Sequence, residues 1–192
     1  FHVELGTVIS RWNVDEVQNI AQYVTKLGVD SYRNEIAEQR SEMFNTENDI
    51  TPDPKQYEKA IGYFVHQIRD NMKNRLLFQR ITNAFRLEYY NLAIQILTEN
   101  RQVIPCYAGW LSAHILPDGE LWECSVMGSS MGNVRDVDYD FRRLWFGRRA
   151  DEVRYAVKTR GCYCPVANIS YTNMMADPIS VVRVGINVLR GG

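Results

Sequence analysis

The sequence lacks long apolar runs and lacks a marked excess of charge of either sign. No stretch approaches the roughly 18 apolar residues that a membrane-spanning helix needs, and the first residues lack the basic and apolar blocks of a secretory signal peptide. The 22 basic and 23 acidic side chains leave a formal net charge of -1, so no overall field attracts nucleic acid or a membrane surface. We therefore expect a cytoplasmic protein with neither nucleic-acid nor membrane partners.

The composition is that of an ordinary globular chain. Hydrophobic residues make up 45% of the 192 positions and aromatic residues 11%, which is enough for a buried core in one or two domains. The first residue is Phe1 rather than a methionine, and a predicted strand follows it directly. We therefore expect this chain to be a piece of a longer protein.

Residues 1–36 carry the pattern of a β-α-β unit. Two segments rich in apolar and β-branched residues flank a segment whose apolar residues recur at helical spacing. Asn13 and Glu16 predict a capping box at the start of that helix, and Gly28 predicts a left-handed cap at its end. The two strands are expected to be parallel, with a right-handed crossover. The expected elements are a strand over residues 3–10, a helix over 14–27 and a second strand over 29–36.

Beyond the second strand, the pattern predicts a loop and two helices. Residues 38–51 are polar and aperiodic, and loops at the carboxyl ends of strands in α/β folds often carry function. Glu38 lies at the start of this loop; we interpret it as a salt-bridged loop residue, with substrate contact as the alternative. Asp53 and Pro54 predict the start of a helix. The two helices are expected from there to residue 72 and over residues 77–100.

After Pro105 the sequence changes to short strands, turns and all four cysteines. Pro117, Asp118 and Gly119 predict the turn of a β-hairpin. The arginines between residues 142 and 160 are interpreted as the solvated face of a helix. The expected elements and units are a hairpin of residues 112–116 and 120–124, helices over 144–158 and 178–189, and two domains over 1–104 and 105–192.

The four cysteines indicate metal or redox chemistry. A cytosolic chain of this size neither keeps nor needs a disulfide framework, whereas thiolates suit iron–sulfur clusters and zinc alike. A structural zinc site commonly brings two C-x2-4-C pairs, which this sequence lacks. Two alternatives to a cluster stay open: a zinc-binding interaction module without catalytic activity, and a structural domain whose cysteines bind nothing.

Convergence of the cysteines requires a bend ahead of the hairpin. A hairpin that turns at Asp118 places Cys124 opposite Ser112, and Cys106 then lies about 20 Å further along if the chain is extended. We expect the chain to bend back near Gly109, because glycine accepts backbone conformations that other residues avoid.

Cys106, Gly119 and Cys124 follow the spacing C-x12-G-x4-C. This spacing resembles the opening signature of the SPASM and twitch extensions of radical S-adenosylmethionine (radical SAM) enzymes. The stretch CYAGWLSAHILPDGELWECSVMGSSMGNVRD resembles that family throughout, including the aspartate and glycine of the turn and the downstream Gly-Asn-Val. The resemblance implies an auxiliary four-iron four-sulfur (4Fe-4S) cluster. Its implied ligands are Cys106, Cys124, Cys162 and Cys164.

The sequence departs from a full SPASM domain, which has a C-x2-C-x5-C-x3-C run and holds two auxiliary clusters. Here the run is only Cys162-Tyr163-Cys164, and no cysteine follows. Because four thiolates complete one cluster, one cluster is expected, which resembles the shorter twitch form.

Residues 6–13, with the sequence GTVISRWN, resemble a relaxed form of the G-x-I-x-G-x-x-E motif. In the radical SAM family this motif lines the adenine of S-adenosylmethionine on the fifth barrel strand. Val8, Ser10 and Asn13 stand at the positions of the isoleucine, the second glycine and the glutamate. The resemblance implies that these three residues lie near the cofactor, at the carboxyl end of the strand. Asn13 is equally explained as a helix cap.

The resemblance spans nearly all of the chain and implies an α/β fold. The fold would be the C-terminal part of a partial TIM-type barrel, followed by a small α+β SPASM or twitch-like module. It implies a parent enzyme in which a 5′-deoxyadenosyl radical abstracts hydrogen from a small-molecule, sugar or peptide substrate. The C-x3-C-x2-C loop that binds the second 4Fe-4S cluster, which cleaves S-adenosylmethionine, is absent from this sequence. We therefore expect this chain alone to be inactive.

Overall fold

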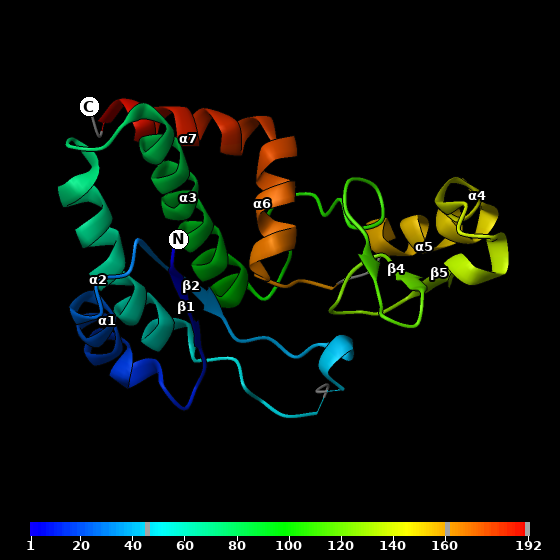
Figure 1. Cartoon of the computed structure of the whole chain (residues 1–192), viewed down its shortest axis with the longest axis horizontal. Helices are drawn as coiled ribbons and strands as arrows, with labels where there is room; N and C mark the ends of the chain where they lie inside the picture. Colours follow the sequence, from blue (N-terminus) through cyan, green and yellow to red (C-terminus); the bar gives the residue numbers. More distant parts are fainter. Residues whose placement is uncertain (45–46, 160–161, 191–192) are drawn as a thin grey trace.

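The computed structural model describes residues 1–44, 47–159 and 162–190, and it arranges them as two lobes side by side (Figure 1). The larger lobe holds a parallel strand pair, two long helices and three shorter ones. The smaller lobe holds three short strands and two helices. Among the described residues, no helix is long and apolar enough to cross a membrane.

The larger lobe begins with the β-α-β unit that the sequence predicts. Strands β1 (Glu4–Ile9) and β2 (Ser31–Ile36) are parallel, with Ile9 and Ile36 as partners in the register. Both of these isoleucines are fully buried. The crossover contains η1 (Val14–Glu16) and α1 (Val17–Lys26). Two strands form the whole of this sheet in the described part of the chain, so the fold is mixed α/β and the partial barrel stays a prediction.

The start of the crossover differs from the expected capping box. The side chain of Asn13 makes no cap hydrogen bond to the helix. Instead, its Oδ1 accepts from the Ser10 amide at 2.7 Å, and its Nδ2 donates to the Val8 carbonyl at 3.0 Å. Asn13 therefore closes the turn at the end of β1. Gly28 has the expected positive φ of 67°.

Two long helices cover the parallel strands. Helix α2 (Pro54–Met72) begins as predicted, because the Asp53 side chain accepts hydrogen bonds from the amides of Lys55 and Gln56. Helix α3 (Leu77–Glu99) follows, and its first turn is exposed, with Leu77 64% accessible. The main core lies between these helices and the sheet. Its largest fully buried members are Ile9, Ile36, Tyr57, Ile61, Tyr89 and Ile96.

Two C-terminal helices return to the larger lobe. Helix α6 (Ala167–Ala176), which the sequence pattern did not predict, places Met174 in the main core. Helix α7 (Pro178–Arg190) packs against α3, where Val184 joins a second apolar cluster. Figure 1 shows both helices beside α3 and away from the three-stranded sheet. The predicted division groups these helices with the second module; α7 packs against α3 of the first, and α6 has residues in the cores of both.

The smaller lobe is built on an antiparallel sheet of three strands. The predicted hairpin is confirmed, and Gly119 in its turn has a φ of 94°. A third strand, absent from the prediction, adds to the hairpin. The single helix expected over 144–158 is instead two helices that meet at Gly147. The elements are β3 (His114–Ile115), β4 (Glu120–Trp122), β5 (Ser130–Asn133), η3 (Val134–Val137), α4 (Phe141–Trp145) and α5 (Arg148–Thr159).

The long loop after β2 connects the two lobes. Its short helix η2 (Ser41–Met43) reaches the smaller lobe, where the Ser41 amide donates to the Val126 carbonyl at 3.1 Å. Oε1 of Glu42 also lies 3.1 Å from Nε2 of His114. The loop that the sequence marks as functional is therefore held against the cysteine-bearing lobe.

Candidate metal centre

A tight turn positions the first cysteine. Directly after Cys106, the Tyr107 carbonyl accepts a hydrogen bond from the Trp110 amide at 2.9 Å, so the chain reverses. Gly109 has a φ of 75°, which favours glycine at the bend. The Tyr107 amide donates to Oδ1 of Asn173 on α6 at 2.8 Å. The bend expected at Gly109 is confirmed, and α6 fixes the backbone beside Cys106.

The other cysteines follow β4 and α5. Cys124 comes two residues after the end of β4, and its sulfur accepts a hydrogen bond from the Met127 amide at 3.3 Å. Cys162 and Cys164 come after α5, with Tyr163 between them. Residues two apart in an extended segment share one side of the chain, so this spacing lets both sulfurs face the same cavity.

All four cysteines line one cavity of about 200 Å³. No disulfide is present among the described residues. The other residues that line this cavity are mostly apolar, and the exceptions are Gln102, Glu123 and Tyr163. The apolar side chains that share the cavity with the cysteines are Ala108, Val126, Met127, Val157 and Ile169.

Burial disfavours the charged form of these thiols. It raises the pKa of Cys124 to about 11, against the opposing hydrogen bond from the Met127 amide. Burial also raises the pKa of Cys164 well above its ordinary value, and the nearby Glu38 adds to that shift. A bound metal supplies the positive charge that turns such thiols into thiolates. Metal binding in this cavity would therefore release protons.

The cavity brings the thiols together without a preformed ion site. In the part of the chain that the structure describes, no group of three or more Cys, His, Asp or Glu side chains is already arranged to hold a metal ion. Thiolate sulfur is the donor that iron–sulfur clusters use. The assignment of all four cysteines as ligands stays a prediction, now with a shared cavity to support it.

Comparison with known families gives a match within the cysteine-bearing part of the chain. Residues 106–165 match the model of SPASM, described as an iron–sulfur cluster-binding domain. The match begins at Cys106 and includes all four cysteines. This segment is therefore similar to SPASM iron–sulfur cluster-binding domains. No curated protein and no solved structure matches the chain.

Glu123 is a site residue that the sequence reasoning missed. Its side chain is 1% exposed and lines the cysteine cavity. Its Oε2 accepts a hydrogen bond from the Ser129 amide at 2.7 Å, which ties β4 to the segment ahead of β5. The only sequence signal is its position next to Cys124. From the sequence alone, an acidic residue at this position is expected to be an exposed strand residue.

The three residues predicted near S-adenosylmethionine gather at the carboxyl end of β1. Val8 is 54% exposed, and the turn that Asn13 closes holds the backbones of Val8 and Ser10 together. The structure thus brings the three into one turn. The large cavity that opens beside this turn is lined by Arg11, from the same segment.

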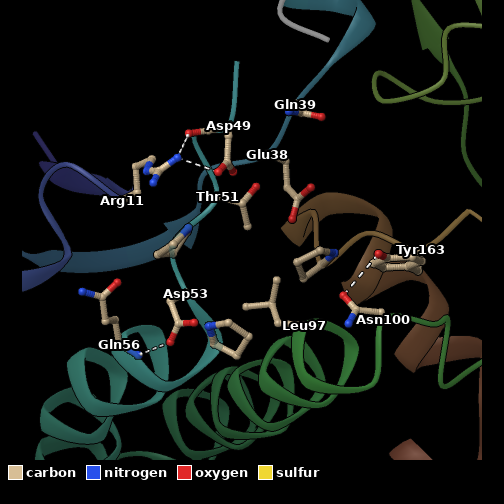
Figure 2. A pocket seen from close by; sticks show the side chains of 13 residues that line it. Arg11, Glu38, Gln39, Asp49, Thr51, Asp53, Gln56, Leu97, Asn100 and Tyr163 are labelled. Carbon is tan, nitrogen blue, oxygen red and sulfur yellow. Dashed lines mark hydrogen bonds and ion pairs between the residues drawn. The ribbon is translucent and has the colours of Figure 1, made fainter. Parts of the chain in front are cut away.

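That large cavity has a volume of about 810 Å³ and lies where the two lobes meet (Figure 2). Its walls come from the carboxyl ends of β1 and β2, the start of α2 and the end of α3. Tyr163 completes the wall, and its hydroxyl donates to Oδ1 of Asn100 at 3.2 Å. Tyr163 lines the cysteine cavity as well, so the two spaces lie next to each other at this residue.

Glu38 points into this cavity (Figure 2). Burial raises the pKa of its carboxyl to about 7, and the opposing charge of Arg40 lowers it only in part. Among the described residues, the carboxylate has neither a hydrogen bond nor an ion pair. The salt-bridged interpretation drawn from the sequence is therefore wrong for Glu38.

Proposed function

We propose that this chain is the C-terminal part of a radical SAM enzyme and that its SPASM module holds one auxiliary 4Fe-4S cluster. The observation that carries the proposal is that the segment matching the SPASM model places all of its cysteines around one cavity. The parallel β-α-β unit ahead of that segment supports the barrel half of the proposal.

The residues around the cavity fit an iron–sulfur cluster. The proposed ligands are Cys106, Cys124, Cys162 and Cys164, four soft donors that suit cluster iron. The apolar side chains around them limit water access, which tunes the reduction potential of such a group. When bound, the cluster would supply a one-electron carrier or a point of substrate attachment.

The larger lobe would contribute to the pocket for S-adenosylmethionine and substrate. Val8, Ser10 and Asn13 lie at the carboxyl end of β1, the edge at which barrel enzymes place their active sites. The sequence lacks the C-x3-C-x2-C loop, so cleavage of S-adenosylmethionine would need that loop from elsewhere in the parent protein.

Anaerobic reconstitution tests the proposal. The 192-residue chain is incubated with ferrous iron, sulfide and an equal amount of zinc, then desalted. The proposal predicts bound iron with acid-labile sulfide and a broad visible absorption. Zinc alone, with no sulfide, would identify a structural zinc module and overturn the proposal.

A further inference from the structure

The described residues that line the large cavity include three carboxylates and one cation. The carboxylates are Glu38, Asp49 and Asp53, and the cation is Arg11. The other polar groups are neutral amides and hydroxyls. Figure 2 shows the charged side chains that line the cavity: Arg11 after β1, Glu38 and Asp49 in the loop after β2, and Asp53 at the start of α2. The cavity therefore carries more negative than positive charge.

Two of the three carboxylates are already engaged. Nη1 of Arg11 lies 2.5 Å from Oδ2 of Asp49 and also bonds the Asp49 carbonyl at 3.2 Å. Asp53 accepts from the amides of Lys55 and Gln56 at 2.9 and 3.3 Å. The single cation is thus neutralised within the wall. Glu38 is left as the acidic group that faces the space without a partner of its own.

Leaving a half-buried carboxyl without a partner costs free energy unless something binds it. A ligand that donates N–H bonds removes that cost, since both the neutral and the ionised carboxyl accept hydrogen bonds. An anionic ligand would be repelled by the excess negative charge of the cavity wall. The volume of about 810 Å³ lies within the range of small-molecule sites, roughly 300 to 1,000 Å³.

We propose that this cavity binds a ligand through a positively charged nitrogen group, a primary ammonium or a guanidinium, that donates to the Glu38 carboxylate. Neutral groups of Gln39, Thr51 and Asn100 line the same space and suit the polar remainder of the ligand. The inference rests on the proposed function only in treating this ligand as the substrate of the parent enzyme. The cation could belong to a free amine or to a basic side chain of a peptide.

Three matched probes test the charge preference of the unaltered chain. They are the N-acetyl N-methylamides of lysine, norleucine and glutamate, titrated into the anaerobically reconstituted protein and followed by NMR. The lysine probe is expected to bind about tenfold more tightly than the norleucine probe, because a charge-assisted hydrogen bond is gained. The glutamate probe is expected to bind least. Equal affinities for the three, or no binding at millimolar concentration, overturn the proposal.

Two variants assign the preference to one residue. Glu38→Gln should reduce the advantage of the lysine probe to less than about twofold, since the charge-assisted bond is lost. Glu58→Gln removes an exposed charge on α2 outside the cavity and should leave the preference unchanged. Retention of the full preference in Glu38→Gln contradicts the proposal, and the three-probe comparison stands even if that variant fails to fold.

A fourth probe distinguishes a free amine from a basic peptide side chain as the ligand. n-Pentylamine carries the ammonium and an alkyl chain without peptide groups. Weaker binding of n-pentylamine than of the lysine probe favours a peptide, and equal binding favours a free amine. Iron and sulfide are measured on the same samples: a cluster without probe discrimination defeats only this inference, and discrimination without a cluster defeats only the proposed function.

Discussion

The guanidinium of Arg154 joins three parts of the smaller lobe. It donates to the carbonyls of Gly109 at 2.7 Å and Trp145 at 2.6 Å, and it pairs with Asp151 at 2.9 Å. Its Cζ lies 5.4 Å from the ring centre of Trp110 and 4.7 Å from that of Trp145. With 6% of its surface exposed, it is not the solvated side chain that the arginine-rich pattern predicts. It holds the turn that positions the first cysteine.

Replacing Arg154 with methionine should destabilise this lobe. The substitution keeps the apolar stem but leaves two carbonyls without their donor, at about 1 to 3 kcal/mol each. We expect a loss of about 2 to 4 kcal/mol in the free energy of unfolding, measured by urea titration with tryptophan fluorescence. Arg148→Met is the matched control, because that side chain is 93% exposed, and it should change stability by less than about 0.5 kcal/mol. Equal effects of the two variants would contradict a structural role for Arg154.

The unpartnered Glu38 should make stability depend on pH. Its carboxyl pKa is raised from 4.5 to about 7 by burial, so the folded chain keeps this proton at pH values where the unfolded chain has lost it. The free energy of unfolding therefore falls as pH rises from 4.5 to 7. Other charges near this carboxyl come from Arg40 in its own loop, Tyr57 on α2 and Cys164 in the smaller lobe.

Glu38→Gln removes this titration. The variant should gain stability over the unaltered chain as pH rises, by at most about 3 kcal/mol at neutral pH. Urea unfolding at pH 5 and pH 7.5 measures the difference, with Glu58→Gln as the control for loss of a surface charge. If the stability difference between the variant and the unaltered chain is the same at both pH values, burial does not raise the pKa of the Glu38 carboxyl.

At the scale of helices and strands, the cysteine cavity is bounded mainly by the smaller lobe, with Ile169 of α6 in its wall, whereas α7 packs against α3 and α6. Cluster binding is coupled to folding when the site is absent from the unfolded chain. Cys124→Ala should therefore lower hydrogen-exchange protection in β4, β5 and α5. Helix α7, which has no residue in the cavity lining, should keep its protection.

Mass-spectrometric hydrogen exchange on the reconstituted protein measures this pattern. The control is Cys124→Ala without added iron, in which the same elements should already be exposed. If α7 loses protection together with β4 and β5, this helix depends on the cysteine-bearing lobe, and its packing against α3 does not stabilise it independently.

The regular elements were predictable where one local signal dominates. Apolar and β-branched content predicts β1 and β2, helical spacing of apolar residues predicts α2 and α3, and Asp53 with Pro54 predicts the start of α2. Helix α6 was missed because its apolar and polar residues lack helical spacing. Packing of its residues against the rest of the fold stabilises this helix instead. The break at Gly147 was missed because a single glycine within a helical pattern does not by itself end a helix; in the structure the backbone is so close there that a Cβ would lie 2.8 Å from the Arg143 carbonyl oxygen.

The cysteines of the candidate site could be predicted from the sequence, but the residues that form the cavity walls could not. The spacing from Cys106 to Cys124 and the turn at Gly119 lie within one segment, so the sequence carries them. The cavity walls come from distant segments, as when Tyr163 meets Asn100 across 63 positions. The missing partner of Glu38 depends on where α2 and the smaller lobe lie, which no local pattern encodes.

On the scale of the whole molecule, the two lobes share the large polar cavity, and Tyr163 lines both that cavity and the cysteine cavity. The loop after β2 ties the lobes together through Ser41 and through the contact of Glu42 with His114. A ligand in the polar cavity would therefore lie beside the proposed cluster ligands. This arrangement suits either role of an auxiliary cluster, electron transfer or substrate attachment.

The central claim is that the four cysteines together hold one cluster, and iron and sulfide per chain test it most directly. After anaerobic reconstitution, the unaltered chain should contain about four irons and four sulfides. Cys106→Ala, Cys124→Ala, Cys162→Ala and Cys164→Ala should each retain less than about half of that iron, because each removes one of the four thiolates. Met127→Leu, which removes a thioether sulfur from the same cavity, should retain all of it. Full iron content in any one of the cysteine variants would contradict the claim.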